Sequence, residues 1–257
     1  MEGESAVVSC ISTAPLRLLA PRPRGASAWA VAASYGGGLV AGDQICLQVE
    51  VEEGATALLG TQAETKVYRS RGACCAAEVR ARVAPGAALA LVPDPVSCFA
   101  GARYRQLLEV DVAAGGTLLL VDALVAGRSA RGERWAFDEY SSRVEVASGG
   151  RLVLADAVRL VSREGPPVAE RMADWDLLAT VVCVGPRLAQ QAADLLAELR
   201  RQPADGSAGV VCAASPLADG LHLRLAARGA EAGLERLRSL LRFLPALLGD
   251  DPFLRRP

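Results

Sequence analysis

The sequence predicts a mainly β protein: stacked hairpins forming a β-helix-like double-sheet scaffold, with two helices in the C-terminal third. Three observations predict this class. Short segments alternate apolar and polar residues, which is the period of a half-buried strand. Glycine turns recur at a spacing of about 30 residues, a period that marks stacked repeats. Amphipathic stretches with helical spacing follow in the last third of the 257 residues.

The first 28 residues predict an edge strand and a linker, and residues 29–257 predict a single domain. Prolines interrupt ladder hydrogen bonding here, so we expect only a short edge strand at Leu16–Leu19, followed by an extended linker. From Trp29 a small apolar strand leads to three consecutive glycines. Glycine permits φ > 0 and close backbone approach, and Asp43 follows at the mouth of the next strand.

Four repeated units align on their glycines: LQVEVEEGATALL, EVRARVAPGAALALV, LEVDVAAGGTLLLV and RVEVASGGRLVLA. In each unit the outgoing strand alternates and the returning strand is more uniformly apolar, as expected of a strand covered on both faces. We expect each unit to be a hairpin. Stacking would then collect the polar segments that follow the units along one side or in a shared groove. The alternative is ordinary hairpin stacking with solvated loops.

The last third predicts a buried strand at Leu177–Val184, a helix beginning at Pro186, and a hairpin formed by GVVCAA and LHLRLAA. A second helix is expected from Glu231 to about Leu248, kinked at Pro245. We expect both helices to be packing elements. The leucines of the second helix fall on one stripe, which we interpret as exposed and as a candidate partner surface. The stripe contains Leu234, Leu237, Leu241, Leu244 and Leu248.

Composition excludes several classes of protein. A formal charge of −1 argues against nucleic-acid or membrane-surface binding through a basic field. The seven cysteines contain no CxxC pair, which favours free thiols in a reducing compartment. The N-terminus lacks the basic flank and apolar core of a signal peptide, and no apolar run approaches the ~20 residues of a membrane helix. A soluble cytoplasmic protein is therefore expected.

Two polar segments contain the densest candidate chemistry. In Thr61 to Arg71, the side chains of Glu64, Lys66 and Tyr68 would share one face of a strand; a solvated, ion-paired edge is the alternative. The segment from Gly127 to Arg143 mixes arginines and carboxylates with large aromatics, which favours a partly buried network.

Other residues carry weaker signals. His222 has no second histidine to pair with and is interpreted as a strand histidine, which makes a His-based zinc site implausible. Most cysteines fall in apolar strands, where they are interpreted as small hydrophobes; Cys98, in a segment expected to be a loop, is the one cysteine for which a functional role stays open. Phosphate-binding, metalloprotease and nucleophile-elbow motifs are absent from the sequence.

From about Pro15 to Pro252 the chain resembles the urease accessory protein D family (UreD, called UreH in some organisms). Five motifs occur in the family's order and at roughly its spacing. They are GGGLVAGD, TQAETKVYRS, LVPDPVSCFAGARYRQ, AGRSARGERWAFDEYSSR and LLGDDPF. Two positions depart from the pattern: Glu64 replaces a small polar residue, and Ala123 stands where tryptophan is common.

The resemblance implies a non-catalytic factor that binds apo-urease, joins UreF and through it the GTPase UreG, and helps deliver Ni²⁺ to the urease active site. It implies no tightly bound cofactor, only transient Ni²⁺, and no small-molecule substrate. An internal water-filled passage is the nickel route proposed for the family. A carrier that must release Ni²⁺ should avoid clusters of His and Cys, which bind it tightly.

The candidate passage carboxylates are Asp43, Glu64, Glu133 and Asp138, since each lies on the same side of successive units. The residues expected to pair with or support them are Lys66, Tyr68, Arg69, Arg103, Arg131, Arg134, Tyr140 and Arg143. A structural salt-bridge network is the alternative.

Two other functions are open. One is a carbohydrate lyase or hydrolase that uses Asp138, Glu133 and Arg131 as acid, base and charge stabiliser. The other is a structural adaptor with no metal route. An aromatic content of 4% counts against sugar binding.

Overall fold

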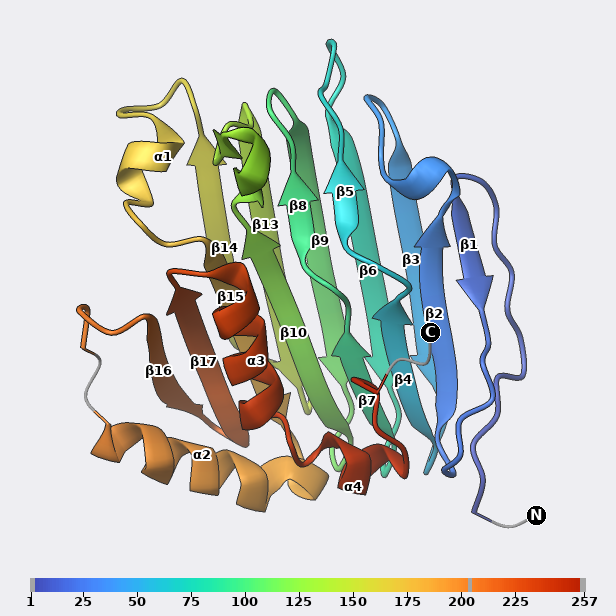
Figure 1. Cartoon of the computed structure of the whole chain (residues 1–257). Coiled ribbons are helices and arrows are strands. Elements are labelled where there is room, and N and C mark those ends of the chain that lie inside the picture. Colours follow the sequence, from blue (N-terminus) through green and yellow to red (C-terminus); the bar gives the residue numbers. More distant parts are fainter. Residues whose placement is uncertain (1–2, 203–204, 255–257) are drawn as a thin grey trace.

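The computed structural model describes residues 3–202 and 205–254 in three layers: a large sheet lies between a small sheet and a layer of helices (Figure 1). The large sheet contains β1 (Leu16–Leu19), β2 (Ala28–Ser34), β4 (Thr56–Thr61), β5 (Thr65–Val67), β7 (Ala88–Val92), β8 (Val96–Cys98), β10 (Thr117–Val125), β15 (Leu177–Val184), β16 (Val210–Leu217) and β17 (Gly220–Ala227). Its order is β1-β2-β4-β7-β10-β15-β17-β16, with β8 joined to β10 and β5 to β8.

The small sheet contains β3 (Gln44–Val51), β6 (Cys75–Val83), β9 (Arg103–Val112), β13 (Glu139–Ser148) and β14 (Arg151–Val161), in the order β14-β13-β9-β6-β3. A separate short ribbon is formed by β11 (Gly127–Arg128) and β12 (Glu133–Arg134). The helices are α1 (Val168–Arg171), α2 (Ala189–Arg201), α3 (Ala230–Leu240) and α4 (Leu244–Leu248). No helix in the described ranges is long and apolar enough to cross a membrane. The predicted fold class is confirmed, including the edge strand β1 and the two longer helices of the last third.

The strand pairing inside the repeated units differs from the predicted hairpins. The strands β3 and β4 lie in different sheets, and so do β6 and β7, and β9 and β10. Equivalent strands of successive units instead pair in parallel, so that β3, β6, β9 and β13 form consecutive ladders. This arrangement lets the apolar faces of the two sheets bury each other while each ladder is completed by the next unit. Among the four repeated units, only the last forms the expected antiparallel hairpin, between β13 and β14. The hairpin expected in the last third is also present, between β16 and β17.

Glycine turns close each crossing between the sheets. Gly54 and Gly86 both have φ of +70°, a left-handed conformation that costs glycine little. Successive turns stack: the Gly54 N–H donates to the Pro85 carbonyl at 3.3 Å, and the Gly86 N–H to the Gly115 carbonyl at 3.2 Å. These turns lie at the end of the stack opposite to α1 (Figure 1).

Three apolar clusters hold the layers together. The first fills the space between the sheets with aliphatic side chains such as Leu89 and Val110. Towards the α1 end this space is filled instead by large aromatic side chains, among them Trp135 and Phe137. The third cluster joins the large sheet to the helices.

The leucine stripe of the last helix pair is buried, and the prediction of an exposed partner surface is wrong. Leu237, Leu241, Leu244 and Leu248 are each 5% exposed or less and pack in the cluster between the helices and the large sheet. The helical region is interrupted after Leu240, ahead of the predicted kink. The stripe is apolar because it covers a strand layer that needs burial on both faces.

Candidate functional site between the two sheets

A line of polar side chains crosses the interior face of the large sheet. Asp122 on β10 is the direct partner of Thr180 on β15, and Thr180 is the direct partner of Arg224 on β17. Direct partners on antiparallel strands project from the same face of a sheet. Because the carboxylate of Asp122 contacts the small sheet, this face is the interior one.

The small sheet supplies complementary donors at the same level. Gln106 on β9 and Ser142 on β13 are direct partners. The Gln106 Nε2 donates to Asp122 Oδ1 at 2.7 Å, and the Ser142 Oγ donates to Asp122 Oδ2 at 2.7 Å. The hydroxyl of Tyr104 donates to Gln106 Oε1 at 3.2 Å, and the Tyr140 hydroxyl lies 3.4 Å from Gln106 Nε2. Both oxygens of Asp122 are therefore held across the space between the sheets.

Burial dominates the electrostatics of this group. It raises the pKa of Asp122, which the negative charge of Asp156 raises further, while the hydrogen bonds from Ser142 and Gln106 oppose the shift. Burial also raises the pKa of Tyr104 and of Tyr140 well above the ordinary value, so both remain neutral hydroxyls. Asp122 keeps some accessible surface although β10 is a central strand of the large sheet, between the small sheet and the helices. A carboxylate in this position is stabilised by its donors and by water that can reach it.

Asp156 on β14 lies at the outer end of the line. Its side chain is 7% exposed, and Arg224, whose side chain is 59% exposed, donates to Oδ1. The His222 Nε2 lies 3.6 Å from Asp156 Oδ2. Burial lowers the pKa of His222, Arg224 lowers it further, and Asp156 opposes the shift. The line therefore runs from a buried carboxylate to an arginine at the surface.

We call this set the interior polar row. It consists of Tyr104, Gln106, Asp122, Tyr140, Ser142, Asp156, Thr180, His222 and Arg224.

The polar segments after the repeated units stack at the α1 end of the sheets (Figure 1). The Ser70 N–H donates to the Gly101 carbonyl at 2.9 Å, and the Gly101 N–H donates to the Ala136 carbonyl at 3.0 Å. Arg128 lies over the Phe99 ring, 4.2 Å from its centroid. The stacking follows from the parallel pairing of the strands that precede each segment.

The four predicted passage carboxylates have separate environments at this end. Asp43 accepts the Val40 N–H at 2.8 Å and closes its own turn. Glu133 is held by Arg128 through two oxygens and accepts the Ala100 N–H, and these hydrogen bonds lower its pKa. Asp138 is half-buried and Glu64 is exposed. Across residues 3–202 and 205–254, no three or more His, Cys, Asp or Glu side chains gather as a metal site.

The predicted supporting residues form local pairs instead of one network around these carboxylates. Arg134 pairs with Asp176, and Arg143 pairs with Glu145. Lys66 and Arg131 are exposed.

The remaining predicted supporting residues contact a carboxylate, a loop carbonyl or an aromatic ring. Arg103 pairs with Glu139 at 3.3 Å, and Arg69 Nε lies 3.5 Å from the Ala100 carbonyl. Tyr68 packs edge-to-face on Phe99 with ring centroids 5.3 Å apart. Tyr140 alone among the predicted residues belongs to the interior polar row.

The two carboxylates of the interior polar row are not among the site residues predicted from the sequence. Asp122 is the only charged residue in the run TLLLVDALV, and Asp156 stands in LVLADAVRL. A single carboxylate in a strand expected to be covered on both faces is itself a signal, because it is costly unless paired or hydrated.

Comparison with known proteins identifies relatives along the whole chain. A family model described as UreD urease accessory protein matches residues 1–256. A urease accessory protein UreD of Anaeromyxobacter sp. (strain Fw109-5) is 57% identical over 257 residues, which cover 100% of this chain and 86% of the relative. A UreD protein of Sorangium cellulosum is 49% identical over 255 residues, covering 99% and 80% of the two chains. A urease accessory protein D of Arabidopsis thaliana is 37% identical over 192 residues, covering 72% and 65%.

Proposed function

The chain belongs to the UreD urease accessory protein family, and from that premise we propose that it is a non-catalytic factor that binds apo-urease and helps deliver Ni²⁺ to the urease active site. In this proposal it acts in the cytoplasm with UreF and, through UreF, with the GTPase UreG. Ni²⁺ is cargo and not a resident cofactor. Family membership supports the role in urease maturation.

The interior polar row is the observation that supports a route through the protein. It places two carboxylates, Asp122 and Asp156, between the sheets and ends at the exposed Arg224. We propose that Ni²⁺ moves along this row, in contact with carboxylate and hydroxyl oxygens. A route of this kind works only if each site is weak enough to release the ion. Oxygen ligands meet that condition better than clustered thiolates and imidazoles, which hold Ni²⁺ more tightly.

Charge exchange gives the row a means of accepting a cation. Burial raises the pKa of Asp122, so its ionised form is disfavoured unless a positive charge comes close. An incoming Ni²⁺ supplies that charge and favours the ionised carboxylate of Asp122. At the outer end of the row, the guanidinium of Arg224 donates a hydrogen bond to the Asp156 carboxylate. A cation that enters there must displace this guanidinium.

The geometry disfavours the lyase or hydrolase alternative. Glu133 is the general base of that alternative, and the hydrogen bonds from Arg128 lower its pKa, which makes it a weaker base. Both Glu133 oxygens are occupied by Arg128.

The experiment co-expresses the chain with urease subunits, UreF and UreG, and measures nickel bound per urease together with co-elution of the complex. Asp122→Asn and Asp156→Asn should assemble normally but leave urease with clearly less nickel. Asp111→Asn, an exposed carboxylate on β9, is the matched control. Glu64→Gln tests the exposed carboxylate expected from the sequence. Normal nickel loading by both interior variants would reject the route and favour a structural adaptor.

A further inference from the structure

The sandwich is open along the edge formed by β3. The small sheet ends at β3, whereas the large sheet continues past β4 to β2 and β1. The inward-facing Leu47 and Val49 are therefore only half-buried, while Leu108 and Val110 on β9 are buried. A cleft of about 850 Å³ lies here, with β3, β4 and residues 3–16 among its walls.

Within residues 3–202 and 205–254, the main-chain groups on the outer edge of β3 have no strand partner. The Ala76 N–H donates to the Asp43 carbonyl and the Ala84 N–H to the Val51 carbonyl, so the odd-numbered residues of this strand face β6. The N–H and C=O groups of the alternate residues point away from β6. They belong to Gln44, Cys46, Gln48 and Glu50.

The N-terminal segment covers the cleft without completing the sheet. It is anchored at Ser5, whose N–H donates to the Ala26 carbonyl at 2.7 Å and whose Oγ accepts the Thr56 N–H at 2.9 Å. Among the described residues, no main-chain hydrogen bond joins this segment to β3. An unpaired strand edge of this kind is a template for a strand from another chain.

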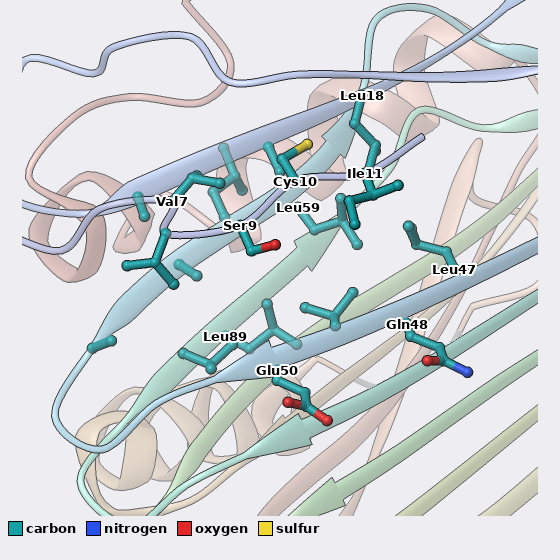
Figure 2. A pocket seen from close by; sticks show the side chains of 18 of the residues that line it. Val7, Ser9, Cys10, Ile11, Leu18, Leu47, Gln48, Glu50, Leu59 and Leu89 are labelled. Atoms are coloured by element: carbon teal, nitrogen blue, oxygen red, sulfur yellow. The ribbon is translucent and has the colours of Figure 1, made fainter. Parts of the chain in front are cut away.

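The cleft has an apolar interior and an acidic rim. Figure 2 shows Leu47 on β3, Leu59 on β4 and Leu89 on β7 lining the cleft. Ile11 lies on the N-terminal segment, and Glu50 lies at the margin of the cleft. The rim contains Glu4, Glu50, Glu52 and Glu53. Glu50 approaches Arg82 only at 3.8 Å, and both side chains are largely exposed, so the pair offsets little of this charge.

We propose that this cleft binds an extended segment of a partner protein that adds a strand to β3. Its alternate apolar side chains would enter the cleft beside Leu47 and Leu59, since residues two apart on a strand share a face. Lys or Arg residues flanking the segment would meet the acidic rim. The site lies at the edge of the sandwich opposite to Arg224, and it does not depend on the nickel route (Figure 1).

The test uses a short fluorescent peptide of alternating valine and threonine flanked by lysines, titrated onto the full chain and followed by anisotropy. Gln48→Pro removes an outward N–H without removing a bond to β6, and should weaken binding about fivefold, the effect of one hydrogen bond. Gln48→Ala keeps the N–H and should bind normally. Hydrogen exchange across Gln44–Val51 should slow when the peptide is bound.

The acidic rim is tested separately, which keeps the proposal falsifiable if Gln48→Pro does not fold. The triple variant Glu50→Gln, Glu52→Gln and Glu53→Gln should bind the lysine-flanked peptide more weakly and with less dependence on salt. A glutamate-flanked peptide should bind the native chain poorly. Equal binding of both peptides, or no binding of either, would overturn the proposal. A concentration-dependent dimer that Gln48→Pro abolishes would also overturn it, because the occupant would then be a second copy of the chain.

Discussion

Asp122 and Ser142 are joined by a hydrogen bond of 2.7 Å although they lie on strands of different sheets. The second donor to Asp122 is Gln106, which lies beside Ser142 on the same small sheet. A buried carboxylate linked to two donors on the opposite sheet restricts how the sheets can shift past each other. The same residues carry the proposed nickel route, so stability and function can be measured on the same variants.

The raised pKa of Asp122 predicts a specific pH dependence of stability. Because the folded-state pKa lies above the unfolded value, this group stabilises the fold below the ordinary aspartate pKa, and that contribution is lost as pH rises through the raised folded value. Asp122→Asn should lack this component. Urea unfolding of the native protein and of Asp122→Asn at a series of pH values measures this pH-dependent contribution. If the stability of both proteins depends on pH in the same way, the raised pKa of Asp122 is contradicted.

Removing a donor to Asp122 should be costly. Ser142→Ala leaves one carboxylate oxygen of Asp122 without its donor, and we expect the free energy of unfolding to fall by about 1–3 kcal/mol. Ser141→Ala is the matched control, since its side chain lies on the opposite face of β13. Chemical denaturation of both variants makes the comparison. A similar small effect in both would mean that the hydrogen bond contributes little.

Arg224 should matter more than its exposure suggests. Its partner Asp156 is buried, so Arg224→Gln leaves a desolvated carboxylate without its main counter-charge and should destabilise the fold by about 1–3 kcal/mol. Arg159 pairs with Glu164 at the surface, and Arg159→Gln should change stability far less than Arg224→Gln. Thermal unfolding of both variants at low and high salt measures the cost of losing each ion pair. Equal costs would show that water reaches Asp156 freely.

The cysteines should react with thiol reagents in two groups. Cys10 and Cys46 are exposed and should be modified in the native protein, whereas Cys98 and Cys183 are buried and should react only on unfolding. Burial raises the pKa of Cys183 to about 12 and raises that of Cys98 still further, which disfavours the reactive thiolate. Cys98→Ala should accordingly leave the nickel loading of urease unchanged. Rapid native labelling of Cys98, or loss of nickel loading in a folded variant, would assign that thiol a functional role.

The buried leucine stripe predicts a stability effect and not a binding effect. Leu241 is fully buried between the helices and the large sheet, and Leu241→Ala should cost about 2–5 kcal/mol. Leu152 is 64% exposed, and Leu152→Ala should be nearly neutral. Denaturant midpoints of the two variants provide the measurement. A stable Leu241→Ala protein that no longer joined its partners would restore the partner-surface interpretation.

Family membership and most of the local structure could be predicted from the sequence. Alternation over residues such as Leu47, Val49 and Val51 indicates a half-buried strand, because side-chain direction reverses at every residue. The glycine turns and the helical spacing of leucines locate the remaining elements. The four carboxylates at or beside the polar segments were the natural candidates for a site, since loops carry functional residues in many proteins.

Local patterning by itself therefore determined which segments are strands, where they turn and which of their faces are apolar. It could not determine which strands pair, because a half-buried strand has the same period in a hairpin and in a parallel stack. Tertiary structure decided that equivalent strands of successive units pair, and this register brought Gln106, Asp122 and Ser142 together from three different strands. It also placed Asp156 beside Arg224, 68 residues apart. Buried carboxylates acquire partners only through such long-range pairing, and for that reason the interior polar row is a property of the fold.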